Sequence, residues 1–124
     1  FLKDQPKFLF EYGQCLSKTG QYEEGIRILT EGTRLSADPM FYNIMGKDAE
    51  ALKHFGQAEA CFKQASYMVP HRLYPLYLLA KMYFESGQSE KGRDMARQVI
   101  QKEPKVMSDA VKEMKAELEE RLKP

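Results

Sequence analysis

The chain has 124 residues, of which 43% are hydrophobic, enough to bury a core of ordinary size for one domain. Its 19 basic and 18 acidic residues nearly cancel, so no overall field attracts nucleic acid or an anionic membrane. Apolar runs such as 76–80 are far shorter than the roughly 20 residues of a membrane span. Cys15 and Cys61 are too few and too widely separated for a metal or redox motif, and we expect each to be a small buried or half-buried thiol within a predicted helix.

The first residues resemble the end of a helix. FLKDQP has the same order of apolar, polar and proline residues as VIQKEP at 99–104. We therefore interpret residues 1–5 as the remnant of a preceding helix, with an unrelated terminus as the alternative. The chain begins with Phe1 rather than Met, which favours a piece of a longer protein.

Helical spacing of apolar residues then predicts helical hairpins along the chain, at 6–18 with 22–35, within 39–70, and at 73–86 with 89–102. Asp38 is a candidate N-cap for a third helix that opens at Pro39. Gly25 and Gly32 lie inside the second helix, where each costs roughly 1 kcal/mol relative to alanine. We expect close contact with a neighbouring helix to offset that cost.

The hairpin at 39–70 shows the pattern most clearly. Apolar or small residues recur at i, i+3, i+4 and i+7 in its first half, and the spacing continues in its second half, at Tyr42, Met45, Gly46 and Ala49, then Ala58, Phe62 and Ala65. Gly46 and Ala58 lack bulk where two helices must approach closely. Pro70 stops the second helix because it has no N–H to donate.

The hairpin recurs with a period of about 34 residues, and in this it resembles the tetratricopeptide repeat. Gly46 corresponds to Gly13 and Ala80, and Pro70 corresponds to Pro104. The resemblance implies an all-α fold, a right-handed superhelix of three helix-turn-helix repeats at 6–38, 39–72 and 73–106. One departure is Lys53, which stands at the turn position that glycine occupies at 20 and 87.

Residues 107–124 are predicted to form a C-terminal capping helix. Ser108 can cap it, and a narrow apolar stripe follows at Val111, Met114, Leu118 and Leu122. A repeat array needs a terminal element that covers the exposed apolar face of the last repeat and has a charged outer face toward solvent. The alternative is a helix that docks on a partner or swaps between protomers.

No pattern in the chain predicts catalysis. His54 and His71 have no metal-ligand spacing, and glycine-rich phosphate loops and nucleophile motifs are absent from the sequence. We therefore expect no catalytic residues, no metal site and no cofactor.

In the repeat family, the first helix of each hairpin lines a concave wall that binds peptide segments. We expect the core side of the first helix to hold Leu9, Tyr12, Gly13 and Leu16. The residues rotated away from it are the predicted groove-binding residues, Lys7, Phe10, Gln14, Met40, Asn43, Lys47, Tyr74, Tyr77, Lys81 and Phe84. Such a surface suits a protein or peptide segment with apolar side chains and a carboxylate. Alternatively, Phe10, Tyr77 and Phe84 fill gaps between adjacent helices.

One subclass of the family binds chaperone tails through a lysine and asparagine clamp. Apolar or aromatic residues stand where that clamp needs polar or basic groups, at Phe10, Ile44, Tyr74 and Leu78. The sequence therefore argues against a chaperone-tail adaptor.

A narrower resemblance involves residues 38–47, 65–87 and 102–115. These stretches are similar to the soluble C-terminal repeat region of bacterial O-antigen ligase-family membrane proteins. That resemblance implies an accessory domain, tethered to a bacterial inner membrane through an upstream region that carries the glycosyl-transfer chemistry. The side of the membrane is left open.

The leading hypothesis is thus a non-catalytic interaction or scaffold module. The alternatives are a module that binds polysaccharide directly and a structural spacer or oligomerisation array.

Overall fold

The computed structural model describes residues 5–104 and 106–124. These residues form seven helices and no strands, namely α1 (Pro6–Lys18), α2 (Tyr22–Thr33), α3 (Met40–Ala51), α4 (Phe55–Met68), α5 (Tyr74–Glu85), α6 (Ser89–Gln101) and α7 (Asp109–Leu122). The interpretation of 1–5 as a helix remnant falls outside the described residues except at Gln5, which directly precedes α1. The helix ends lie within about two residues of the predicted ends, the usual uncertainty of a helix boundary.

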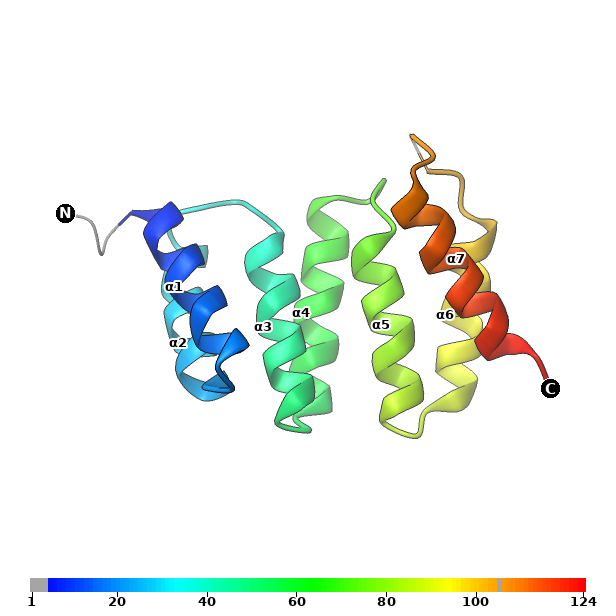
Figure 1. Cartoon of the computed structure of the whole chain (residues 1–124), viewed down its shortest axis with the longest axis horizontal. Coiled ribbons are helices and arrows are strands. Elements are labelled where there is room, and N and C mark those ends of the chain that lie inside the picture. The colour runs from blue at the N-terminus through cyan, green and yellow to red at the C-terminus, as the bar shows by residue number, and fades with distance from the viewer. Residues whose placement is uncertain (1–4, 105) are drawn as a thin grey trace.

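The helices follow one another along an elongated array, with α1 and α2 at one end and α6 and α7 at the other (Figure 1). Each helix packs against the next one in the chain, and α3 also contacts α1 and α5. The prediction of an all-α solenoid, with three hairpins followed by a final helix, is confirmed. Within the described ranges, no helix combines the length and hydropathy that crossing a bilayer requires.

The seam between α3 and α4 depends on Gly46. The ring of Phe62, on α4, is fully buried against the α3 backbone at this point. A Cβ atom on Gly46 would lie 2.4 Å from Cε1 of that ring, far inside van der Waals contact. The missing side chain is therefore what allows the two helices to approach this closely.

The three hairpin turns share one backbone feature. Gly20 and Gly87 have φ angles of 81° and 79°, and Lys53, at the corresponding place, has a φ of 62°. Lys53 thus adopts the left-handed conformation despite its Cβ, at a cost of roughly 1–2 kcal/mol. The turn geometry is kept where the sequence departs from glycine.

Helix α7 packs onto its own chain. Leu118 is fully buried, and the rest of the predicted stripe packs around it against residues of α5 and α6. Ser108 caps the helix, its Oγ accepting a hydrogen bond from the Val111 N–H at 3.2 Å. Lys115 donates to the carbonyls of Ile100 and Lys102 at 3.0 and 2.7 Å, which ties α7 to the end of α6.

Two expectations about the first helix are wrong. Tyr12 is 42% exposed and packs beside Phe8, with ring centroids 6.0 Å apart, instead of joining the core. Cys15 is exposed as well, whereas Cys61 is buried and burial raises the pKa of its thiol to about 11. The cause is that α1 packs on α2 and α3 alone among the described helices, so its remaining face has no neighbour.

Candidate functional site

The first helices of the three hairpins enclose two hollows that join into one surface. A hollow of about 320 Å³ lies between α1 and α3, and one of about 680 Å³ lies between α3 and α5. Lys47 and Ala51 line both of them. We call this surface the first-helix groove; its other lining residues include Gln14, Ser17, Lys18, Tyr22, Ile44, Asp48, Glu50, Phe55, Tyr74, Tyr77, Leu78, Lys81 and Glu85.

Lys47 is an open cation at the centre of the groove, where the two hollows meet; Lys18 and Lys53 each line only one hollow. Its side chain is exposed, on the third turn of α3. In the part of the chain that the structure describes, no carboxylate oxygen lies within 4.0 Å of its ammonium. An incoming carboxylate could therefore pair with Lys47 without displacing an existing partner.

Lys81, at the corresponding position of α5, is already engaged. Its ammonium lies 3.3 Å from a Glu117 carboxylate oxygen of α7, donates to the Tyr77 hydroxyl at 3.1 Å and sits 5.0 Å from the centre of that ring. Burial acts to lower the pKa of Lys81, but the contacts with Tyr77 and Glu117 outweigh it and the pKa is raised. The equivalent lysines of α3 and α5 thus differ in availability.

Two aromatic rings form the wall beyond Lys81. Tyr74 and Tyr77 stack with centroids 6.2 Å apart. The Tyr77 hydroxyl donates to the Glu117 carboxylate, with oxygen separations of 2.9 and 3.1 Å, and burial is the main reason that the pKa of Tyr77 is raised. These contacts fix the Tyr77 ring against α7.

An acid that the sequence interpretation missed lies at the floor of the groove. Asp48 is only 2% exposed, and the Ser17 hydroxyl of α1 lies 2.8 Å from its Oδ2. Gly25 of α2 makes room for the carboxylate, since a Cβ there would lie 3.0 Å from the same oxygen. Burial raises the pKa of Asp48 to about 6, against the opposing effects of the Ser17 hydrogen bond and the Lys47 charge. A sequence signal existed, because Asp48 follows Met45 by three residues on the core side of α3.

The structure brings half of the predicted groove residues together. Five of them line the two hollows, namely Gln14, Lys47, Tyr74, Tyr77 and Lys81. Lys7 and Met40 do not line either hollow; Lys7 is exposed and the Met40 sulfur lies 3.5 Å from the Asn43 amide nitrogen. A binding role for any of these residues stays a prediction.

The remaining three are placed differently from the prediction. Asn43 is 2% exposed, and its Oδ1 has no hydrogen-bond partner among the described residues. Phe10 packs edge-on against Phe41 with centroids 5.2 Å apart, which is the gap-filling alternative. Phe84 packs close to Gly92, in the cluster under α7. The reason is that α3 contacts α1, and α7 contacts α5, so side chains near these crossings are covered.

The groove lacks the marks of a metal centre. Within residues 5–104 and 106–124, no three His, Cys, Asp or Glu side chains are grouped closely enough to hold a metal ion.

Comparison with known proteins gives consistent matches in sequence and in structure. Family models described as tetratricopeptide repeat match residues 6–39 and 76–105, which together are just over half of the chain. No curated protein sequence matches the chain.

Three solved structures illustrate the likeness, and each is a TPR or TPR domain. The "First TPR of Spaghetti (RPAP3) bound to HSP90 peptide SRMEEVD" has a TM-score of 0.75 at 19% identity and covers 98% of each chain. The Arabidopsis OM64 TPR domain has a TM-score of 0.75 at 16% identity, covering 98% of this chain and 100% of its own. The Sgt2 TPR domain from Aspergillus fumigatus also has 0.75 at 16% identity, covering 94% and 78%. At these identities the likeness establishes the fold.

Proposed function

The chain belongs to the tetratricopeptide repeat family, and on that basis we propose that it is a non-catalytic interaction module whose first-helix groove binds an acidic peptide segment. The structural neighbour with an HSP90 peptide supports a partner that is a peptide or protein. The observation that carries the proposal is the open ammonium of Lys47 in the wall shared by both hollows.

The charges around the groove favour one carboxylate contact at Lys47. Lys81 is neutralised by Glu117, and Glu50 and Glu85 line the same hollow. The pKa of Glu50 is raised, mainly by burial and also by Glu85, so added negative charge is disfavoured on that side. A ligand with a single acid seated near Lys47 fits this distribution better than a uniformly anionic chain.

We expect Lys47→Glu to reduce the selection of acidic peptides. A phage library of random dodecapeptides, selected on the immobilised chain, should be enriched in Asp and Glu. Reversing the charge replaces attraction with repulsion, and the best peptide should lose at least about tenfold in affinity. Fluorescence anisotropy with that labelled peptide measures the loss.

Lys112→Glu is the matched control, because Lys112 is exposed on α7 and lines neither hollow. It should leave both the acidic enrichment and the affinity unchanged. Equal losses of affinity in the two variants would assign the effect to net charge. If Lys47→Glu kept the affinity and the acidic enrichment of the unaltered chain, the groove would be excluded as the binding site.

Direct polysaccharide binding and a pure spacer role are the competing proposals. An acidic hexuronate oligosaccharide, titrated while tyrosine fluorescence is recorded, should give no saturable change if the groove is selective for peptides. Sedimentation at several protein concentrations tests the oligomerisation alternative.

We also propose that this domain is an accessory part of an O-antigen ligase-family membrane protein, on the similarity of residues 38–47, 65–87 and 102–115. In that setting it would recruit partners while the glycosyl-transfer chemistry lies in another part of the polypeptide. The complete gene sequence tests this directly: about a dozen upstream hydrophobic spans support it, and their absence contradicts it.

A further inference from the structure

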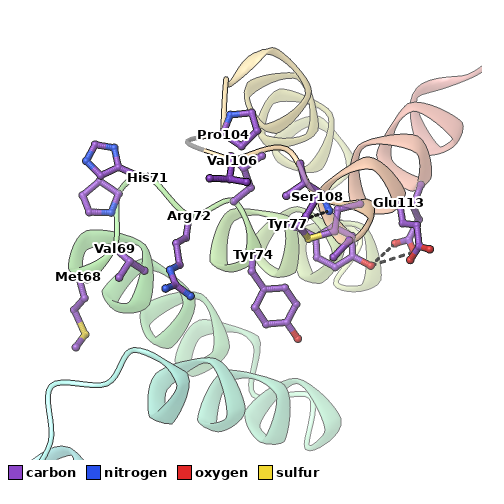
Figure 2. A pocket seen from close by; sticks show the side chains of 16 residues that line it. Met68, Val69, His71, Arg72, Tyr74, Tyr77, Pro104, Val106, Ser108 and Glu113 are labelled. Carbon is purple, nitrogen blue, oxygen red and sulfur yellow. Dashed lines mark hydrogen bonds between the residues drawn. The ribbon is translucent and has the colours of Figure 1, made fainter.

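A third and larger hollow, of about 960 Å³, adjoins the first-helix groove (Figure 2). It lies between the loop that joins α4 to α5, the start of α5, and the N-terminal half of α7. Tyr74 and Tyr77 line this α5–α7 cavity and the groove alike, so the two are continuous. Sequence patterns do not indicate this cavity, because it exists only once α7 packs beside α5.

The cavity wall is mainly aliphatic. Its apolar lining includes Val69, Leu73, Val106, Val111 and Met114. Val106 is 74% exposed, an unusual state for a large apolar side chain beside a hollow. A surface of this kind gains from burying an apolar group.

The charged side chains at the rim of the cavity differ in whether they already have a partner. Glu117 is held by Lys81 and Tyr77, as described above. Arg72, exposed on the α4–α5 loop, has no carboxylate oxygen within 4.0 Å among the described residues. Lys47 in the groove and Arg72 in the cavity are therefore open cations on either side of the Tyr74–Tyr77 wall.

From this arrangement we infer that the ligand is a peptide with a bulky apolar side chain, flanked by acidic residues, and that the side chain inserts into the α5–α7 cavity. The inference rests on the proposed function and names its ligand more closely. The apolar side chain meets the aliphatic wall, while the carboxylates pair with Lys47 and Arg72. The carboxylate of Glu113 also lines the cavity, and it disfavours additional acidic residues in the part of the peptide that lies next to it.

The dodecapeptide library tests the inference with a pair of variants. Ala110 is exposed and lines the cavity, whereas Ala116 is exposed on the same helix and does not. Peptides selected on the unaltered chain should be enriched in Trp, Phe or Leu as well as in Asp and Glu. Ala110→Glu should lose the apolar enrichment and keep the acidic residue that pairs with Lys47, and Ala116→Glu should keep both enrichments.

Affinities give the same test in solution. Replacing the selected Trp or Phe by Ala in the best peptide should weaken binding to the unaltered chain at least about tenfold. The same replacement should have almost no effect on binding to Ala110→Glu, or to Val106→Trp, which fills the cavity from an exposed position. Circular dichroism confirms that each variant keeps its helices.

The outcomes separate the two proposals. Acidic enrichment without apolar enrichment, or apolar enrichment that survives in Ala110→Glu, overturns the cavity inference and leaves the groove proposal standing. A library from which no peptide is enriched overturns both. Reduced acidic enrichment in Lys47→Glu with apolar enrichment retained supports separate roles for the groove and the cavity.

Discussion

Gly46→Leu is expected to lower the free energy of unfolding by about 1–3 kcal/mol. The new side chain would start 2.4 Å from the fully buried ring of Phe62, which is rigid and has no free space to move into. Leucine has a higher helix propensity than glycine, but this offsets less than about 1 kcal/mol of the destabilisation. Urea unfolding followed by circular dichroism measures the change.

The matched control is Gly56→Leu, in the first turn of α4. Apart from its chain neighbours and the backbone of its own helix turn, nothing lies within 4 Å of a Cβ placed on Gly56, so the substitution there should be neutral or stabilising by up to about 1 kcal/mol. Equal destabilisation by the two variants would mean that the α3–α4 seam does not depend on the missing side chain.

Asp48→Asn is expected to stabilise the protein at neutral pH and to have little effect near pH 4. The pKa of Asp48 is about 6 in the folded chain and about 3.9 in an unfolded one. Between these values the folded state keeps a proton that the unfolded state has released, so the stability contributed by Asp48 falls as pH rises from about 4 to 6. Above pH 6 the buried charge costs on the order of 2–3 kcal/mol, which the amide avoids.

Unfolding free energies of the two proteins across pH 4–8 measure this difference. The gain from Asp48→Asn should grow between pH 4 and 6 and then level off, with the Ser17 hydroxyl still able to donate to the amide oxygen. Asp94→Asn, at a carboxylate 68% exposed, serves as the control and should show no such growth. A gain independent of pH would contradict the raised pKa of Asp48.

The fold followed from the sequence because its determinants are local and repeated. Small residues such as Gly46 mark close helix approaches, and the stripe around Leu118 marks the face that α7 buries. These signals rest on spacing along one helix, which the sequence displays directly. The exposed Tyr12 was predicted wrongly because its burial depends on a neighbouring helix that α1 lacks among the described residues.

The candidate site was only half predictable for the same reason. Lys47 and Lys81 hold equivalent positions on α3 and α5. Of these two lysines, only Lys81 forms an ion pair with Glu117, which lies 36 residues further along the chain, on α7. Phe84 shares the predicted groove face with Lys81 and is covered by the same helix. Asp48 was overlooked because its burial arises from three helices that meet around Gly25. Contacts between distant segments decide which side chains stay open, and spacing along one helix does not report them.

The most direct test of the groove is an amide chemical-shift map of the ¹⁵N-labelled chain, titrated with the best peptide from the library. Saturable shifts should concentrate on Gln14, Lys47, Tyr74 and Tyr77, and on the part of α7 that lines the cavity. Shifts concentrated on α2, α4 and α6, or the absence of any saturable shift, would contradict binding in the first-helix groove.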